Sequence, residues 1–189
     1  MTSDRYAVQR ERSERSSHLS PKVFVSYVHA PDAHKDLVLD FARFLESQGV
    51  ATTLDRWTTA ERKDWYTWIV GEITSADYVL TIASKQYRDV FDGSPPAGKR
   101  HGTQAEAALL RELLYSDRAT WLPKVLPVVL DGHTVDEIPL ILQPRGADHY
   151  SIPEFTETGA ERLLRVLFGK PKHLRPVRGT PPALPPKSW

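Results

Sequence analysis

A glutamate at the start of a predicted helix is the side chain best placed to do chemistry. Residues 104–115 form this helix, and the spacing of Ala105, Leu109 and Leu113 sets the direction that we expect to be buried. Glu106 projects about 60° from that direction at 100° per residue. Its carboxylate is therefore expected to border the apolar face of the helix rather than to point into water.

Depth along the helix distinguishes Glu106 from Glu112, which borders the other side of the apolar face. A helix that follows a strand begins near the carboxyl end of that strand, where ligands bind in parallel α/β sheets. Glu112 lies about 9 Å further along the helix at 1.5 Å per residue, so we expect it to be a surface residue. Glu106 is the catalytic candidate. The alternative is a first-turn acid that the helix dipole stabilises.

A half-buried carboxylate beside aromatic rings suits the cleavage of a glycosidic bond. The transition state of that reaction carries positive charge on the sugar ring, and a fixed negative charge stabilises it more than the ground state. Trp57, Trp65 and Tyr27 could stack on a flat heterocycle. For each tryptophan the alternative is a place in the core.

Five side chains that can bind a ligand come at the ends of the first two predicted strands. They are Ser26, Tyr27, His29, Asp55 and Trp57. The carboxyl ends of parallel strands lie on one edge of a sheet, so we expect these residues to gather there. Ser26 lacks the Gly-x-Ser-x-Gly surroundings of a nucleophile, and it is expected to hydrogen-bond the backbone or a ligand.

Several kinds of chemistry are excluded by what the sequence lacks. With no cysteine, the chain has no disulfide, zinc-thiolate site or thiol nucleophile. It has no His-Glu-x-x-His, and the spacing of His29 and His34 is no metal signature, so no metal site is predicted. These two histidines could instead hydrogen-bond a substrate. Neither Gly-x-Gly-x-x-Gly after a strand nor Gly-Lys-Ser/Thr occurs, so no standard phosphate cradle is present.

The composition suits a soluble globular protein, with 40% hydrophobic and 26% charged residues in a chain of 189. A formal net charge of +1 gives no overall attraction to nucleic acid or to an anionic membrane, and neither partner is predicted. No apolar run reaches the roughly 20 residues of a membrane span, and the N-terminal segment lacks the apolar core of a signal peptide. A cytoplasmic location is the default expectation.

Apolar patterning predicts strands that alternate with helices. The predicted strands are residues 22–28, 50–54, 78–83, 125–130 and 150–152, and the predicted helices are the segment between Asp32 and Gly49 and residues 65–75, 104–115 and 157–168. We expect Asp32 to cap the first helix, and Trp65, Trp68, Ile69 and Ile73 to be buried by the second. The alternation predicts an α/β, flavodoxin-like three-layer sandwich with a five-stranded parallel sheet.

One domain is expected, from residue 21 to residue 171. Residues 1–20 are rich in Arg, Glu and Ser without an apolar period, which predicts a disordered leader. The loops 55–64 and 92–102 are expected to be exposed, the second of them mobile. Residues 172–189 are rich in proline and basic residues, and could be a linker to a further domain or a ligand for an aromatic groove.

Five segments, taken together in their order and spacing, carry a family resemblance. They are residues 23–27 followed by Asp32, His34 and Lys35, residues 49–57 ending in Leu-Asp-Arg-Trp, residues 76–80, residues 102–115 with Glu106, and residues 124–130 followed by Ile138-Pro139. Over roughly residues 21–171 the chain resembles SEFIR domains, which are relatives of the Toll/interleukin receptor (TIR) domains. Val28-His29 and residues 103–105 depart from the usual family pattern.

The resemblance implies a TIR-like fold and self-association, or association with other SEFIR or TIR-like domains. It also implies hydrolysis of NAD at the ribose–nicotinamide bond, as in many bacterial members that act as antiviral, immune-type effectors triggered by assembly. NAD is then a substrate, and no cofactor is expected. Glu106 would be the catalytic carboxylate. The nucleotide pocket would be lined by Ser26, Tyr27, Asp55 and Trp57, and the assembly loop would contain Arg56, Arg62 and Lys63.

The same fold supports catalytic and non-catalytic domains. One alternative is therefore a signalling adaptor that recruits proteins by homotypic contacts, as eukaryotic SEFIR members do. Another is a nucleotide-binding sensor without turnover. The presence of Glu106 favours an NAD glycohydrolase. Hydrolysis and cyclisation of the NAD ribose begin with the same bond cleavage, so both stay open.

Overall fold

The computed structural model describes residues 20–29, 31–58, 64–93 and 101–183. Its centre is a five-stranded sheet with the order β2-β1-β3-β4-β5. All neighbouring strands pair in parallel. This order confirms the predicted flavodoxin-like architecture. After β1 the chain first adds β2 on one side and then β3 on the other side of β1. The strand order therefore reverses between β1 and β3, and ligands bind at this point in folds of this kind.

The strands are β1 (Lys22–Ser26), β2 (Ala51–Thr53), β3 (Tyr78–Ile82), β4 (Val125–Leu130) and β5 (Tyr150–Ile152). The α-helices are α2 (Asp32–Ser47), α3 (Trp65–Ser75), α4 (Lys85–Phe91), α5 (His101–Ser116), α6 (Arg118–Trp121) and α7 (Glu161–Leu167). Short 3₁₀ helices form at η1 (Asp55–Trp57), η2 (Val135–Glu137) and η3 (Leu140–Leu142).

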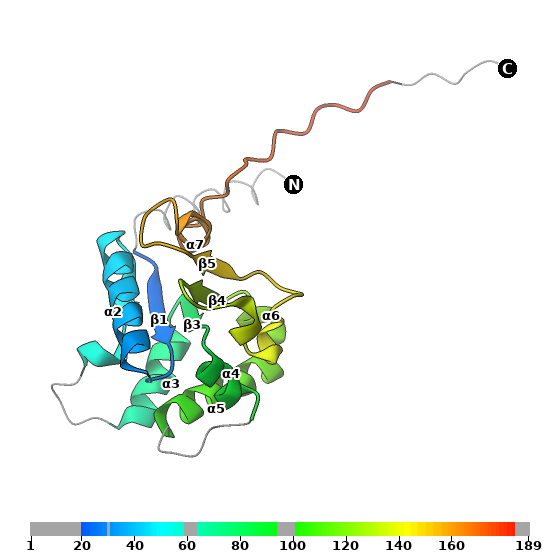
Figure 1. The fold of residues 1–189 in the computed structure, drawn as a ribbon. Coiled ribbons are helices and arrows are strands. Elements are labelled where there is room, and N and C mark those ends of the chain that lie inside the picture. Colours follow the sequence, from blue (N-terminus) through cyan, green and yellow to red (C-terminus); the bar gives the residue numbers. More distant parts are fainter. Residues whose placement is uncertain (1–19, 30, 59–63, 94–100, 184–189) are drawn as a thin grey trace.

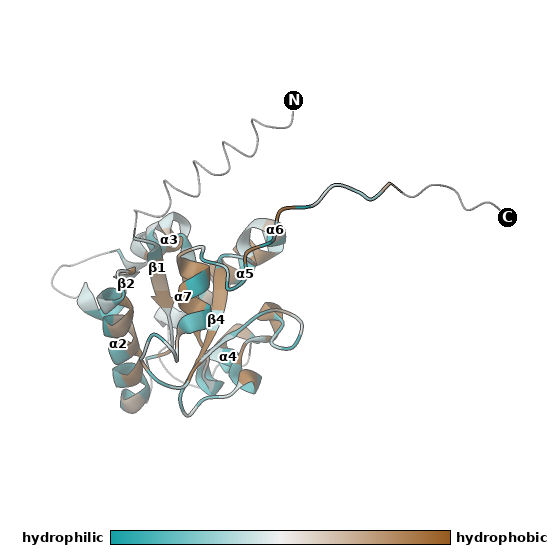
Figure 2. Cartoon of the chain, turned by 90° about the horizontal axis from the view of Figure 1, so that it is seen from above, coloured by the Kyte–Doolittle hydropathy of each residue, from teal (hydrophilic) through white to brown (hydrophobic). Residues whose placement is uncertain are grey.

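Helices cover both faces of the sheet (Figure 1). One core lies between the sheet and helices α2 and α7, and it contains Val25 and Tyr27 of the β1 segment. The other core lies between the sheet and helices α3, α4 and α5, and it contains Phe24 and Val28. Successive strand residues point to opposite faces, so the apolar residues of β1 contribute side chains to both cores. Figure 2 shows the same pattern, with apolar strands inside and hydrophilic outer surfaces on the helices.

Polar side chains set where two helices begin. The carboxylate of Asp64 accepts hydrogen bonds from the backbone N–H groups of Tyr66 and Thr67 at the start of α3. The hydroxyl of Ser84 accepts one from the backbone N–H of Tyr87 at the start of α4. Such caps satisfy N–H groups that have no partner within the helix. The cap at Ser84 matters for the site because it fixes where Tyr87 enters the core.

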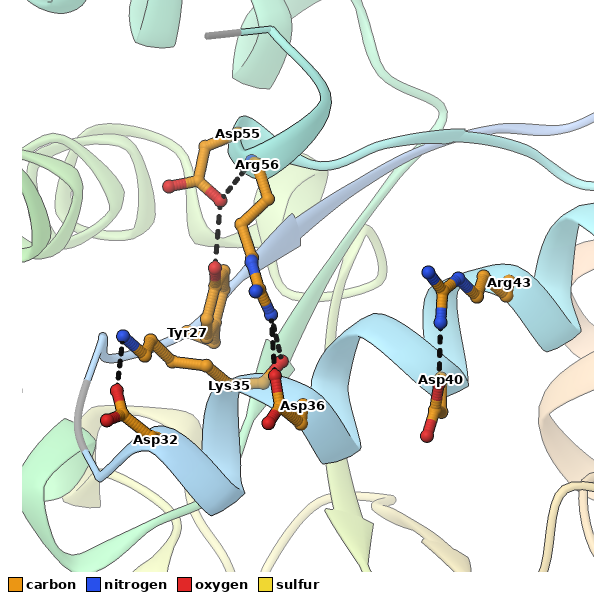
Figure 3. Close-up of polar contacts among 8 residues, drawn as sticks. All are labelled: Tyr27, Asp32, Lys35, Asp36, Asp40, Arg43, Asp55 and Arg56. Atoms are coloured by element: carbon orange, nitrogen blue, oxygen red, sulfur yellow. Dashed lines mark hydrogen bonds and ion pairs between the residues drawn. The ribbon is translucent and has the colours of Figure 1, made fainter.

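The beginning of α2 differs from the prediction, and its end agrees with it. Pro31 occupies the N-cap position, and Asp32 is the first helical residue, so the predicted cap at Asp32 is wrong. Asp32 instead pairs with Lys35 within the first turn (Figure 3). The helix ends before Gly49, whose φ of 82° lies in the left-handed region that favours glycine.

Two helices of the structure are outside the predicted set. Helix α4 has seven residues with three large apolar side chains, and α6 has four residues with one, so neither shows a clear apolar period. Helix α7 begins at Glu161, later than predicted, because residues 157–160 form turns. The predicted loop 92–102 overlaps the start of α5, and its residues 94–100 lie outside the described residues.

The buried face of α5 is rotated relative to the prediction. Its buried residues are Thr103, Glu106, Ala107, Leu110 and Leu114. Ala105, Leu109 and Leu113, which set the predicted direction, are only partly buried. Glu106 therefore lies within the buried face rather than at its border, and Glu112 is exposed. The rotation makes Glu106 a more deeply placed carboxyl group than the sequence indicates.

Helix α3 has the predicted bounds but not the predicted burial. Ile69 and Ile73 are buried, whereas Trp65 is 43% exposed. Trp68 is partly buried and packs edge-on against the ring of Phe24. Trp65 packs edge-on against Trp68, with ring centroids 5.4 Å apart. The predicted burial of Trp65 is wrong, because its ring covers Trp68 from the solvent side.

The C-terminal segment 171–183 is exposed and contains no helix or strand. Figure 1 shows it running away from the sheet. Residues 1–19, which make up nearly all of the predicted leader, and residues 184–189 lie outside the described residues. Among the helices of the described ranges, none is both long and apolar enough to cross a bilayer.

Candidate functional site

A buried carboxyl group lies at the carboxyl end of β1. Ser26, the last residue of β1, donates a hydrogen bond from Oγ to Oε2 of Glu106 over 2.7 Å. Its Oγ also lies 2.8 Å from the hydroxyl of Tyr87. Because the Ser26 proton is used on Glu106, Tyr87 donates to Ser26. The chain of bonds from Tyr87 through Ser26 to Glu106 joins α4, β1 and α5, and it fixes the orientation of the carboxyl group.

Burial raises the pKa of Glu106 from 4.5 to about 7. The residue is only 7% exposed, so its charged form loses most of its hydration. The hydrogen bond from Ser26 lowers the pKa and limits the rise, while the charge of Asp55 adds to it. Near neutral pH the carboxyl group therefore exists in both protonation states, which is a property common among catalytic groups.

A second carboxyl group, that of Asp55 at the start of η1, joins three donors. Its Oδ1 accepts hydrogen bonds from the Tyr27 hydroxyl over 3.0 Å and from the Arg56 backbone N–H over 2.8 Å. Its Oδ2 lies 2.7 Å from Nε2 of His29. Figure 3 shows Tyr27 pointing from the end of β1 toward Asp55. Asp55 therefore ties the segment after β1 to the segment after β2.

Asp55 is ionised, and its charge raises the pKa of both side chains that it binds. Burial opposes its ionisation, but hydrogen bonds from His29 and Tyr27 outweigh burial and lower its pKa. The hydrogen bond to Asp55 raises the pKa of His29. Burial, reinforced by Asp55, raises the pKa of Tyr27, so this phenol stays protonated. The result is an imidazole that readily takes up a proton beside a fixed negative charge.

The two carboxyl groups approach the end of β1 from opposite faces of the sheet. Ser26 faces α5 and Glu106, while Tyr27 belongs to the core under α2. Beyond the strand end the two groups interact, since Asp55 raises the pKa of Glu106 and Glu106 raises that of His29. The polar cluster thus lies at the edge of the sheet where parallel α/β folds bind ligands.

The predicted nucleotide-binding residues differ in how much surface they offer. Ser26 and Tyr27 are buried, and both hydroxyls are bonded within the protein. Asp55 exposes 17% of its side chain, and Trp57 is 43% exposed. Of the four, Trp57 offers the largest free surface. Their role in nucleotide binding stays a prediction.

The predicted assembly loop is described only at its beginning. Nη1 of Arg56 lies 3.1 Å from Oδ1 of Asp36 and donates to the backbone oxygen of Lys35 over 3.1 Å (Figure 3). Arg56 is therefore held against α2 while keeping part of its side chain exposed. Arg62 and Lys63 lie outside the described residues.

Sequence reasoning missed two buried polar residues beside Ser26, one of which is bonded to it. Tyr87 is fully buried, and burial raises its pKa well above the usual value. Thr81 pairs in register with Ser26 and is buried on the same face, and its hydroxyl has no hydrogen-bond partner among the described residues. The available signal was the polar pair Thr81 and Ser84 at the end of an otherwise apolar strand.

A separate pair of histidines lies between α2 and the segment after β4. Nδ1 of His34 lies 3.1 Å from Nε2 of His133, and Nδ1 of His133 lies 2.7 Å from Oε2 of Glu137. Burial and the neighbouring His133 lower the pKa of His34 to about 4, so its imidazole is neutral. Within the described part of the chain, no group of three or more His, Asp or Glu side chains is arranged to hold a metal ion.

Comparisons with known proteins show what the whole chain is similar to. Comparison with curated proteins gives no significant match. The structure is similar to a solved chain described as "Crystal Structure of a prokaryotic SEFIR domain", with a TM-score of 0.60 and 29% sequence identity over 85% of this chain and 100% of that chain. Residues 21–163 match the family model of the SEFIR domain. The chain therefore belongs to the SEFIR family and is a TIR-like signalling domain.

Proposed function

We propose that this domain cleaves NAD at the ribose–nicotinamide bond and releases nicotinamide and ADP-ribose. The observation that carries the proposal is the environment of Glu106. Its carboxyl group is buried, held by Ser26, and has a pKa near neutrality at the ligand-binding edge of the sheet. A carboxylate shielded from water interacts more strongly with a positive charge than one on the surface.

The reaction develops such a charge. When the C1′–N1 bond breaks, its electron pair leaves with the nicotinamide nitrogen, and the ribose ring becomes cationic. Nicotinamide departs as a neutral base, so no acid is needed to protonate it. Ionised Glu106 beside the ribose would stabilise this cation more than the ground state. The exposed ring of Trp57 would offer a surface for stacking.

Assembly forms the second part of the proposal. SEFIR and TIR-like domains generally mediate homotypic interactions, and this chain belongs to that class. We place the contact at Arg56 and the segment that follows it, and assign to assembly the role of switching on an immune-type effector. Arg56 supports this placement because it is fixed against α2 while part of its side chain stays exposed.

A non-catalytic adaptor is the second candidate, and one observation favours it. The hydroxyls of Ser26 and Tyr27 are engaged with Glu106 and Asp55, so the cluster is closed by bonds within the protein. A purely structural cluster would look the same. In that case the domain would recruit other SEFIR or TIR-like domains without consuming NAD.

The test is NAD consumption by concentrated protein, with product analysis for Glu106→Gln and for Glu112→Gln as the matched control. Both glutamates lie on α5, but Glu112 is exposed. We expect wild type and Glu112→Gln to release nicotinamide, and Glu106→Gln to lose at least about a hundredfold in rate. Turnover by Glu106→Gln at the wild-type rate would rule out the assigned carboxylate. An inactive wild type would favour the adaptor.

A further inference from the structure

His29 is held in one orientation at the edge of the cluster. Its Nε2 lies 2.7 Å from Oδ2 of Asp55. Its ring also packs on that of Tyr27, with centroids 4.8 Å apart. These two contacts fix both the position and the tilt of the imidazole, although 53% of the side chain is exposed. The arrangement places a partly solvated imidazole on a partly buried carboxylate.

The hydrogen bonds of Asp55 determine the tautomer of His29. Asp55 is ionised and accepts from three donors, so the proton of a neutral His29 lies on Nε2. The lone pair is then on Nδ1, which has no hydrogen-bond partner among the described residues. A histidine oriented by a carboxylate in this way can act as a general base.

The charges around His29 suit that role. Asp55 and the nearby Glu106 both favour the imidazolium form, while Lys35 on α2 opposes it. Glu106 is the same carboxyl group that is assigned to the ribose cation. His29 would therefore take its proton from a molecule that reacts close to Glu106. The charges of Asp55 and Glu106 would then stabilise the imidazolium that forms.

We infer that His29 is the general base of the hydrolytic step, with Asp55 as its positioning residue. This inference rests on the proposed cleavage of NAD. After the C1′–N1 bond breaks, the oxygen of a water molecule forms a bond to C1′. Nδ1 of His29 accepts the proton that this water loses, and later returns it to solvent. The products are nicotinamide, ADP-ribose and one proton, which balances the reaction.

If His29 is the base, its loss affects the reaction of the ribose cation with water differently from its reaction with a nucleophile that carries no proton. Water must lose a proton as it attacks, whereas the ring nitrogen of a pyridine carries none. A pyridine such as 3-acetylpyridine can therefore take the place of nicotinamide on the ribose without a base. Loss of His29 should slow hydrolysis selectively, while loss of Glu106 should slow both reactions because both pass through the ribose cation.

The experiment measures ADP-ribose and the 3-acetylpyridine exchange product formed from NAD by the full chain. The variants are His29→Gln, whose amide can still donate to Asp55, and His173→Gln, a matched control in the exposed segment 171–183. We expect His29→Gln to lower hydrolysis by about a hundredfold. Exchange should fall far less, so that the product ratio shifts strongly toward exchange. His173→Gln should leave the ratio at its wild-type value.

The possible outcomes distinguish failure of the role of His29 from failure of the proposed NAD cleavage. If His29→Gln lowers hydrolysis and exchange equally, or lowers neither, His29 is not the base, although NAD cleavage stands. If wild type forms neither product, the proposed cleavage fails, and the role of His29 fails with it. A wild-type ratio of hydrolysis to exchange that rises with pH through the titration of His29, and that does not change with pH in His29→Gln, would support the inference independently, because Glu106 acts on both reactions.

Discussion

Oγ of Ser26 donates a hydrogen bond to Oε2 of Glu106 over 2.7 Å, and this bond joins the end of β1 to the buried face of α5. The two residues are separated by 80 positions in the chain. Burial raises the pKa of Glu106, and the hydrogen bond from Ser26 lowers it. Ser26 therefore keeps Glu106 partly ionised near neutral pH.

The first prediction concerns stability. The folded protein keeps the Glu106 proton up to a pH of about 7, whereas an unperturbed carboxyl loses it near 4.5. Between these values the folded state binds more protons, so the contribution of Glu106 to the free energy of unfolding falls as pH rises. The difference is on the order of 3 kcal/mol. Glu106→Gln, which cannot ionise, should therefore be more stable than wild type at pH 8 but not at pH 4.5.

Thermal unfolding at the two pH values measures this effect. Glu112→Gln is the control, since that side chain is exposed and its replacement should leave the pH dependence as in wild type. If Glu106→Gln and wild type show the same change in melting temperature between pH 4.5 and pH 8, the pKa of Glu106 is not raised by burial.

The second prediction concerns the pH profile of NAD cleavage. Ser26→Ala removes the hydrogen bond that favours ionised Glu106, so the rise of kcat/KM with pH should move to higher pH. At pH 7 the rate should fall by about tenfold or more, because hydrogen bonds to charged groups are worth about 1.5–3 kcal/mol. Tyr87→Phe is the matched variant, since it leaves the bond between Ser26 and Glu106 in place. A profile that moves equally in both variants would contradict the assigned role of Ser26.

The third prediction concerns His29 and needs no activity measurement. The hydrogen bond to the Asp55 carboxylate is the main cause of the raised pKa of His29. Asp55→Asn keeps the shape of the side chain and removes its charge, so the pKa of His29 should fall. Nuclear magnetic resonance titration of the labelled imidazole measures the change. An unaltered His29 titration in Asp55→Asn would show that the two side chains are not paired in solution.

The fourth prediction concerns assembly. Arg56→Glu should weaken self-association by about fivefold or more, because it reverses a charge at the proposed contact. Within one chain the change breaks an exposed ion pair with Asp36, which is worth less than about 1 kcal/mol. Combining it with Asp36→Arg restores an ion pair within the chain. Analytical ultracentrifugation should find the double variant still defective, and recovery of self-association would show that Arg56 acts only within its own chain.

Much of the fold could be predicted because most elements carry their own apolar pattern. The bounds of α3, β4 and β5 agree with the prediction, and the parallel pairing of the strands follows from the alternation of strands and helices. The short helices α4 and α6 were not predicted, because they contain only three and one large apolar residues, whereas α7, which is as short as α4, contains four. The rotation of α5 is a tertiary effect, since several of its apolar residues could face the sheet and packing selects among them.

The candidate site was predictable in part for the same reason. Strand ends meet at one edge, so Ser26 and Asp55 could be placed near Glu106 before the structure was known. The bond from Tyr87 to Ser26 could not be predicted, because it depends on an undetected helix. Nor could the pairing of His29 with Asp55, which depends on how the chain turns after β1 and β2.

The most direct test of the central claim is nicotinamide release from NAD by wild type and Glu106→Gln, measured both for concentrated protein and for protein clustered on a surface. We predict release by wild type that increases on clustering, and none above background by Glu106→Gln, whose fold is confirmed by its thermal unfolding. Absence of release from clustered wild type, or equal release by Glu106→Gln, would contradict the assignment of Glu106 as the catalytic carboxylate.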